Sequence, residues 1–260
     1  MEPYLPNYLK GKNRRLVFDL LRERGQMSRA EITRDTGMSF PTAMKVVDAF
    51  LEKGLLVELD ETGPAAGAGR KGRLLRFEPG AYRAVGVECE GRFARVGLAD
   101  MAGGVQARET IELGDFARTR DLSPLAAAIR RMCAAANGAP VLGVCIGFPA
   151  NLDPDAAAIV SYAAMDIQQP TSFAQVFPAF WREVELPVYL ENDANLACEG
   201  EAFLRRGAGG AANMLYLSIG SGCGGAVRLD GKLRRGARCR AGEVGAMLLQ
   251  PALGAPGRSA

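Results

Sequence analysis

The stretch NRRLVFDLLRERGQMSRAEITRDTGMSFPTAMKVVDAFLEK, residues 13–53, decides the fold of the N-terminal part of the chain. Its apolar residues recur at helical spacing in three short runs, which predicts three helices. Asn13 is placed to cap the first helix, and Gly25 is placed to end it. The apolar face of this first helix is expected to consist of Leu16, Val17, Leu20 and Leu21.

The second and third helices are predicted from their end signals. Ser28 lies three residues before Glu31, which is the spacing of a capping box. Gly37 supplies the left-handed residue of a tight turn. Ser39 is expected to cap the third helix, which Gly54 ends. The buried stripe of the third helix is expected to consist of Val46, Val47, Phe50 and Leu51. Three helices with this turn are typical of a helix-turn-helix that reads DNA.

A β-hairpin is expected to follow the third helix. Residues 55–59 and 74–77 have the composition of strands, and the small-residue loop 62–69 leads into the basic run 70–73. Together these segments predict a winged helix, whose third helix contacts base edges and whose basic wing contacts phosphates or the minor groove. A small helical domain with an ordinary charged face is the alternative. The side chains predicted to contact DNA are Ser39, Phe40, Thr42, Lys45, Arg70, Lys71 and Arg73.

Composition gives weaker constraints. The chain has 260 residues and a net charge of +3, and residues 1–78 hold 14 Lys/Arg against 11 Asp/Glu. The excess charge therefore lies in the predicted DNA-binding segment, although it is too small to decide the function. The six cysteines form no C-x-x-C pair and are expected to be mainly buried free thiols. The absence of histidine excludes an imidazole base and any zinc site with a histidine ligand. With no apolar run of membrane-spanning length and no signal-peptide core, we expect a cytoplasmic protein without a membrane partner.

The pattern changes to that of an α/β domain from about residue 81. Asn192 and Asp193 follow a predicted strand and open a predicted helix, which is where open α/β sheets bind ligands. They could hydrogen-bond a polyol, and Asp193 could deprotonate a hydroxyl; helix capping is the alternative. The glycine-rich turn 220–225 could hold a phosphate or be a plain hairpin loop. Strands are expected at 84–88, 94–99, 107–113, 141–146 and 187–190, helices at 122–136, 172–183 and 191–205, and a hairpin at 214–218 and 225–229.

Several motifs in this domain resemble successive signatures of the ROK family, which comprises bacterial sugar-responsive repressors and sugar kinases. GRKGRLLR at 69–76 also resembles the junction that follows the winged helix of its repressors. The resemblance covers residues 13–249 approximately, and it implies an actin-like, RNase H-like sugar-binding domain. The signatures are ENDAN at 191–195, GSGCGG at 220–225, GKL at 231–233 and AGEVG at 241–245.

The resemblance also implies roles for individual residues. Asn192, Asp193 and Glu243 match sugar-contacting residues, and Asp193 would be the catalytic base only in a kinase. The turn 220–225 matches the second phosphate loop of the kinases. Their first phosphate loop, Asp-x-Gly-Gly-Thr, corresponds here to Glu-Cys-Glu-Gly-Arg at 88–92, where acidic side chains would repel a phosphate. We therefore expect no ATP site and no catalytic residue.

A second departure from the family lies near the C-terminus. Ala246 occupies the position of the family's zinc-ligand histidine, and the cysteine cluster expected after it is absent. No zinc and no other cofactor is therefore expected, and the second lobe is expected to be incomplete. The predicted domains are a winged helix-turn-helix at 1–78, a ROK-type sugar-binding domain at 81–250 and a disordered tail at 251–260.

The leading hypothesis is a transcriptional regulator of carbohydrate genes, with repression as the expected sense. Its expected partners are an operator in double-stranded DNA, a sugar effector and a second copy of the chain, because operators often contain paired half-sites. An ATP-dependent sugar kinase is the second hypothesis. A constitutive DNA-binding protein, or a truncated remnant whose sensor is dead, is the third. The sequence does not identify the sugar or the operator.

Overall fold

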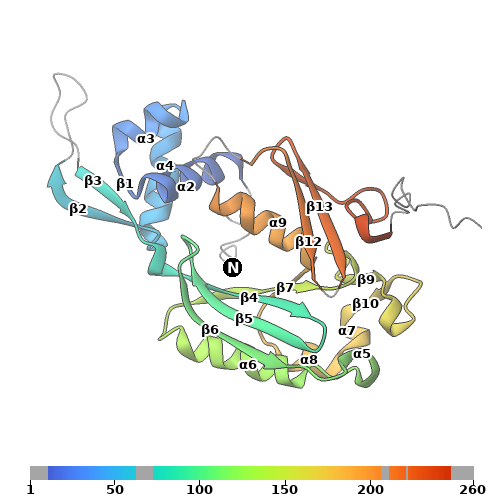
Figure 1. The fold of residues 1–260 in the computed structure, drawn as a ribbon. Helices are drawn as coiled ribbons and strands as arrows, with labels where there is room; N and C mark the ends of the chain where they lie inside the picture. Colours follow the sequence, from blue (N-terminus) through green and yellow to red (C-terminus); the bar gives the residue numbers. More distant parts are fainter. Residues whose placement is uncertain (1–10, 63–72, 206–210, 221, 247–260) are drawn as a thin grey trace, which may run out of the picture. The chain divides into compact units, whose positions relative to one another are not determined.

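The computed structural model describes residues 11–62, 73–205, 211–220 and 222–246 (Figure 1). The chain divides into two compact units, Met1–Glu191 and Asn192–Ala260. The loop and basic run expected between 63 and 72, and the tail expected at 251–260, lie outside the described residues. Within the described residues, no helix is long and apolar enough to cross a membrane.

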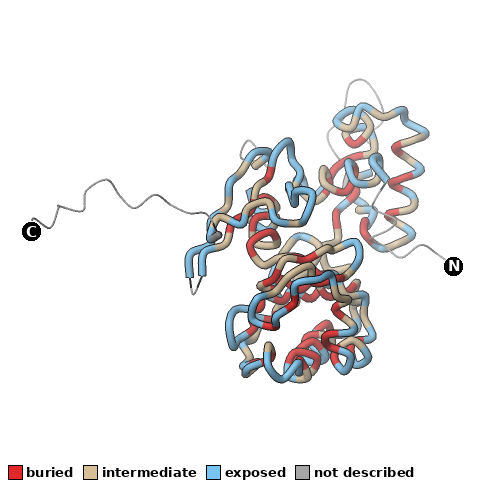
Figure 2. The backbone as a smooth tube through the Cα atoms, turned by 90° about the vertical axis from the view of Figure 1, so that its right-hand side faces the viewer, coloured by how far each residue is buried: buried red, intermediate tan, exposed pale blue. Residues whose placement is uncertain are grey.

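The first unit begins with the three predicted helices, which the structure confirms as α2 (Lys12–Arg24), α3 (Arg29–Thr36) and α4 (Phe40–Glu52). A three-stranded antiparallel sheet accompanies them, in the order β1 (Gln26–Ser28), β3 (Arg73–Phe77) and β2 (Leu56–Thr62). Buried residues recur along the helices (Figure 2). They form one apolar cluster that includes Val17, Phe18, Leu21, Ile32, Val47, Phe50, Leu55 and Leu75.

The end signals of these helices are confirmed in part. Ser28 donates its backbone N–H to Glu31 Oε2 at 2.8 Å and accepts the N–H of Glu31 at 3.3 Å, so the capping box of α3 is present. Gly37 has the expected left-handed conformation, with φ of 66°. The cap predicted for α2 is wrong. The helix begins two residues earlier, with Gly11 at the N-cap position, because the carbonyl of Gly11 accepts the N–H of Arg15, so Asn13 lies inside the first turn.

A five-stranded sheet forms the rest of the first unit's framework, in the order β11 (Val188–Asn192), β7 (Val141–Phe148), β4 (Arg83–Glu90), β5 (Phe93–Asp100) and β6 (Val105–Glu112). β4 pairs in parallel with β7, whereas β5 is antiparallel to both of its neighbours. The helices α6 (Ser123–Ala135) and α8 (Pro178–Glu183) lie on the same face of this sheet (Figure 1). The α/β class predicted for this part of the chain is confirmed.

Two local features differ from the predictions. The single helix expected at 172–183 is two short helices, α7 (Phe173–Val176) and α8, because a proline at position 178 cannot donate a backbone hydrogen bond and starts a new helix. A small antiparallel sheet, unpredicted, consists of β10 (Thr171–Ser172), β9 (Ala158–Ser161) and β8 (Asn151–Asp153). The remaining short elements of the first unit are α5 (Phe116–Thr119) and the 3-10 helices Pro79–Ala81 and Ala163–Met165.

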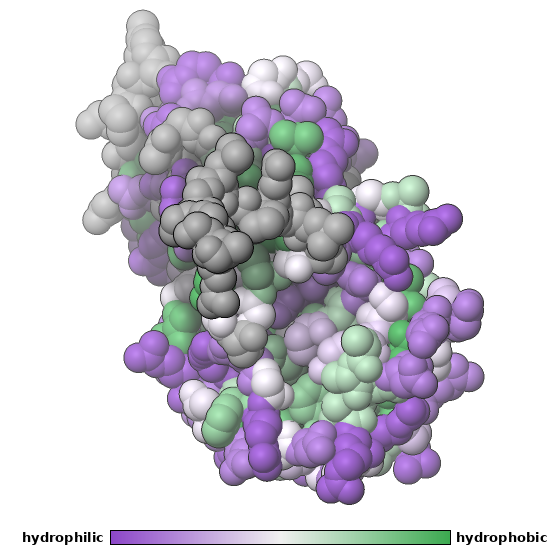
Figure 3. Space-filling view, turned by 45° about the vertical axis from the view of Figure 1, so that its right-hand side comes forward, coloured by the Kyte–Doolittle hydropathy of each residue, from purple (hydrophilic) through white to green (hydrophobic). Residues whose placement is uncertain are grey.

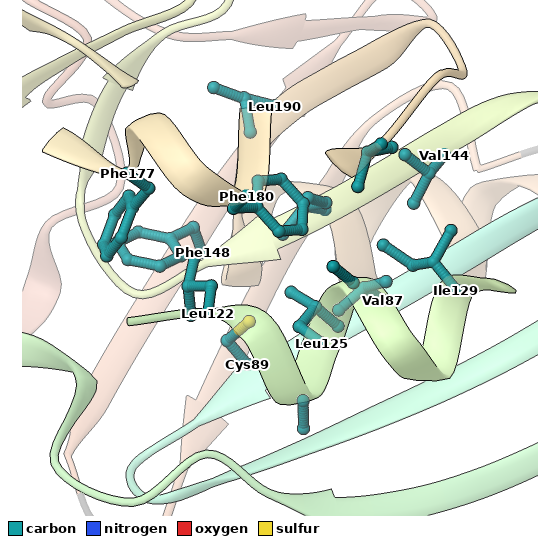
Figure 4. Packing of buried hydrophobic residues seen from close by; sticks show 14 of the residues in the cluster. Val87, Cys89, Leu122, Leu125, Ile129, Val144, Phe148, Phe177, Phe180 and Leu190 are labelled. Atoms are coloured by element: carbon teal, nitrogen blue, oxygen red, sulfur yellow. The ribbon is translucent and has the colours of Figure 1, made fainter. Parts of the chain in front are cut away.

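The core of this part lies between the sheet and its helices (Figure 4). Alternate residues of β4 are buried, among them Val87 and Cys89, and they pack against side chains of α6 such as Leu125. Phe148 and Phe173 are fully buried, with ring centroids 5.4 Å apart in an edge-on arrangement. Each buried side chain of this size contributes about 1.5–3 kcal/mol. The apolar packing therefore holds the sheet rigidly on one side.

The second unit, Asn192–Ala260, contains α9 (Asp193–Leu204) and a three-stranded antiparallel sheet, followed by the 3-10 helix Val244–Ala246. The strand order is β12 (Met214–Ile219), β13 (Cys223–Leu229) and β14 (Lys232–Arg234), which confirms the predicted hairpin. α9 packs against β12 and β13. Arg228 is buried between them, forming an ion pair with Glu199 of α9 and donating to the carbonyl of Ala211 at 3.0 Å.

Candidate functional site

Four of the residues predicted to contact DNA lie together at the start of α4. Phe40 and Thr42 belong to the first turn of the helix, Ser39 precedes it, and Lys45 is exposed one turn further on. The hydroxyl groups of Ser39 and Thr42 are 2.8 Å apart and hydrogen-bonded to each other. Ser39 stands at the N-cap position, but its side chain caps no backbone N–H, so that part of the prediction is wrong. The opposite face of α4 is held by Ala43, Val46, Val47 and Phe50, all buried.

Acidic residues near this surface are paired with arginines. Arg29, at the start of α3, pairs with Glu58 of β2 and lies 3.9 Å from Asp48 of α4. Arg73, which was predicted to contact DNA, is exposed on β3 and also pairs with Glu58, at 3.5 Å. The sequence did not single out Arg29, because its partners lie 19 and 29 residues away. Arg70 and Lys71 lie outside the described residues.

The second candidate site is at the start of α9. Asn192 and Asp193 are both partly buried. The Asn192 side-chain oxygen accepts the N–H of Asn195 at 3.1 Å, which is the capping arrangement weighed as the alternative reading. Asp193 Oδ1 accepts the N–H of Ala194 at 2.9 Å. An ionised carboxylate accepts several hydrogen bonds, so a hydroxyl group is a chemically suitable ligand group for Asp193.

Glu243, which lies 50 positions after Asp193, is brought close enough to interact with it electrostatically. Desolvation of the carboxylate, followed by the negative charge of Asp193, raises the pKa of Glu243, and Arg240 opposes both effects. Because the Glu243 side chain as a whole is exposed, water screens these effects. Neighbouring carboxylates can only accept hydrogen bonds when ionised, so donors such as hydroxyl groups suit the space beside them.

Two glycines place the segment that carries Glu243 against β13. A Cβ atom added at Gly225 would lie 2.7 Å from the carbonyl oxygen of Gly242 and 3.1 Å from Val244. Gly242 has φ of 92° and contacts the Gly225 carbonyl in turn. No side chain fits between the two backbones. Gly225, the last glycine of the turn that resembled a phosphate loop, therefore has a packing role that its sequence does not reveal.

The glycine-rich turn itself is the loop of a β-hairpin. It connects β12 to β13, and the N–H of Gly220 is bonded to the carbonyl of Gly222 at 2.9 Å; Ser221 lies outside the described residues. The sequence left two alternatives for this turn, a phosphate-binding loop and a plain hairpin loop. Its backbone is that of a hairpin loop.

The segment that corresponds to the first phosphate loop is the turn between β4 and β5. Arg95 NH1 lies 3.3 Å from Glu88 Oε2, and Arg95 NH2 lies 2.6 Å from Glu90 Oε2. Arg92 lies 3.6 Å from Glu112. Acidic side chains bound to arginines thus stand at the turn, and a phosphate would have to compete with them for those arginines.

The zinc site that the family resemblance implies corresponds here to Ala246 and the residues after it, of which 247–260 lie outside the described residues. Within the described ranges, no three His, Cys, Asp or Glu side chains come together in an arrangement that could hold a metal ion. An alanine at position 246 has no donor atom, so the described residues do not fit the family's zinc. All six cysteines are free thiols, of which Cys89 and Cys198 are buried as expected, whereas Cys223 is exposed. Burial, together with Glu191, raises the pKa of Cys145 to about 11, so this thiol stays protonated at neutral pH.

The five-stranded mixed sheet and the helices that cover it define a protein of mixed α/β fold. The family model described as "ROK family" matches residues 84–258, which is more than half of the chain. This protein belongs to the ROK family.

Relatives in this family include both regulators and kinases. The chain is 27% identical to a xylose repressor of Caldicellulosiruptor bescii over 91% of its own length and 58% of the repressor's. It superposes on a ROK family transcriptional regulator, a homologue of the E. coli MLC protein, with a TM-score of 0.72 at 19% identity, over 92% of this chain and 59% of that one. A Streptomyces griseus glucokinase in complex with glucose and AMPPNP gives a TM-score of 0.51 at 27% identity, over 65% and 51%. The chain therefore spans about three fifths of the length of the repressor it matches.

Proposed function

We propose that this protein is a DNA-binding transcriptional regulator, acting as a repressor, whose DNA affinity responds to a sugar. One observation carries the proposal: the similarity to the xylose repressor extends over 91% of the chain, so it includes the N-terminal helices as well as the ROK region. The glucokinase structure covers only 65% of the chain. An N-terminal part shared with a repressor favours regulation over catalysis.

We assign residues 1–78 to a winged helix-turn-helix and 81–250 to the sugar-binding domain. The order of α2, α3, α4 and the β2–β3 hairpin supports the first assignment. In such folds the N-terminal residues of the third helix contact bases in the major groove. Lys45 is exposed on α4, and the arginine pairs around Asp48 and Glu58 reduce the negative charge that would face the DNA.

The proposed effector site consists of Asn192, Asp193 and Glu243. Support comes from the electrostatic interaction of Asp193 with Glu243 and from the position of Asn192 and Asp193 at the start of α9. Sugar hydroxyls would donate to these carboxylates. Binding of a sugar would shift the protein toward whichever arrangement binds the sugar better, and the DNA affinity would follow.

A direct connection from α4 to the sheet supports this coupling within the first unit. The hydroxyl of Tyr82 donates to the carbonyl of Lys53, the residue that ends α4, at 3.1 Å. Met101 and Leu142, which belong to the sheet region, pack against the apolar cluster of the N-terminal helices. Because β4 begins at the residue after Tyr82, a shift of β4 would move Tyr82 and so act directly on the end of α4.

A sugar kinase is the second candidate, favoured by the glucokinase similarity and by Asp193 at the position of a catalytic base. The ion pairs of Arg95 with Glu88 and Glu90 speak against it, because they place acidic groups at the turn where the kinases bind phosphate. We therefore propose that the protein works without ATP, zinc or another cofactor. A coupled ADP-release assay across a panel of hexoses tests this directly, and turnover that disappears in Asp193→Ala would establish the kinase.

The experiment for the regulator is selection of bound duplexes from a random DNA pool with the full chain, followed by titrations at several salt concentrations. We expect selective, salt-sensitive binding. Lys45→Ala should weaken it and lower the dependence of log affinity on log salt by roughly one charge. Lys232→Ala, an equally exposed lysine on β14, is the matched control and should leave the titration unchanged. If no sequence is enriched, the regulator proposal fails.

A further inference from the structure

Phe40 is an aromatic side chain that the protein leaves largely in water. Its exposed fraction is 56%, the highest among the exposed large apolar residues of the N-terminal helices and sheet, the others being Leu16 and Val57. It lies three and seven positions before Ala43 and Val47, both of which are buried on α4. Phe40 therefore continues the apolar stripe of the helix past the edge of the core, where it gains little from packing.

The surroundings of Phe40 make this exposure informative. Single exposed apolar residues are common in soluble proteins and need no special explanation. Phe40, however, is flanked by the hydrogen-bonded hydroxyl groups of Ser39 and Thr42, and Lys45 follows on the same helix. An apolar ring, two hydroxyls and an ammonium group thus lie on the first two turns of one helix, with the ring on the side of Ala43 and Val47. This end of the helix can offer both apolar and polar contacts to a base edge, which suits it better than a purely polar ligand.

Major-groove chemistry narrows what such a ring would contact. Among the four base pairs, only those with thymine present a methyl group in the major groove, and apolar side chains, including phenylalanine, contact it. The hydroxyls of Ser39 and Thr42 can donate or accept, so they tolerate several bases. Among these side chains, the ring of Phe40 thus has the narrowest preference among base pairs.

We infer that Phe40 packs against the C5-methyl group of a thymine in the operator and makes the protein prefer thymine at that position. This inference rests on the proposed regulator function and adds to it the chemical identity of one base in the operator. The contact would give specificity, while Lys45 would contribute affinity that depends little on sequence.

The test is a methyl-deletion scan of the selected duplex. Each thymine is replaced in turn by deoxyuridine, which lacks only the methyl group, and the full chain is titrated against every duplex. We expect one position in each half-site to lose affinity by about 4-fold, the effect of exposing one methyl group. Phe40→Ala removes the contact from every half-site at once, so affinity for the unmodified duplex should fall by the product of the single-position losses, and the loss on deoxyuridine substitution at those positions should disappear.

Two further variants make the result decisive. Phe93→Ala removes an exposed phenylalanine of nearly equal exposure, 53%, from β5, and it should leave the thymine preference unchanged. Phe40→Leu keeps an apolar contact and should retain part of the preference. A duplex that shows no methyl effect, or one whose methyl effect persists in Phe40→Ala, overturns the inference while the regulator function stands. A pool that yields no selected duplex at all overturns both.

Discussion

At the scale of single residues, the same kind of amino acid serves different purposes at two helix starts. Ser28 is buried, and its side chain and backbone exchange hydrogen bonds with Glu31 at the start of α3. The backbone hydrogen bond from Ser28 is the main cause that lowers the pKa of Glu31. Ser39 occupies the N-cap position of α4 but leaves its hydroxyl on Thr42 at the surface. The first serine stabilises the fold, whereas the second is available to a ligand.

This contrast predicts different effects of two identical substitutions. Ser28→Ala should lower the free energy of unfolding by about 1 kcal/mol, because it removes the cap of α3. Ser39→Ala should change stability much less, since it breaks only a surface hydrogen bond between hydroxyls. Urea denaturation followed by circular dichroism measures both. Equal losses in the two variants would show that the capping distinction is wrong.

The pair Gly225 and Gly242 is the residue-scale feature on which the proposed sugar site depends. Gly242→Ala should destabilise the second unit by about 1–3 kcal/mol, because the new methyl group meets the backbone of Gly225 and the φ of 92° strains any other residue. Gly222→Ala is the matched control in the same region, since its added Cβ meets nothing within 4 Å. Thermal unfolding of both variants makes the comparison. If Gly242→Ala melts like the wild type, the close approach of the two backbones is refuted.

At the scale of elements, long patterned segments could be predicted and short paired ones could not. The apolar periodicity of α2, α4 and α6 and the continuous apolar run of β7 identified these elements from local sequence alone. β1 spans only three residues and exists through its pairing with β3, which lies almost fifty residues away. No local signal announces such a strand, because its stability comes from the partner.

The candidate sites divide in the same way. The start of α9 could be predicted locally, since polar residues between a strand and a helix are a recognisable pattern. The proximity of Glu243 to Asp193 could be predicted only from the family resemblance, because nothing in the sequence around Glu243 points to Asp193. Arg29 was missed for a related reason: its partners are brought to it by the packing of α3, α4 and β2.

At the scale of the molecule, the proposed regulator needs a DNA-binding surface and an effector site that influence each other. The face drawn in Figure 3 is mostly hydrophilic, with apolar patches between charged side chains. In the first unit, the N-terminal helices and the five-stranded sheet have separate apolar clusters. Met101 and Leu142 of the sheet region pack against the cluster of the N-terminal helices, and Tyr82 donates to the carbonyl of Lys53. A regulator needs such a connection, because two sites influence each other only if both bias a shared arrangement of the fold. A constitutive DNA-binding protein would not need it.

The measurement that tests the central claim most directly is the affinity of the full chain for its selected duplex, by fluorescence anisotropy, with and without each sugar of a panel. We predict that one sugar changes the affinity at least 5-fold, the lower end of typical coupling between sites. Asp193→Ala should bind the duplex normally and lose the response. Affinity that no sugar changes, in the wild type as in Asp193→Ala, would contradict the account and leave a DNA-binding protein without a sensor.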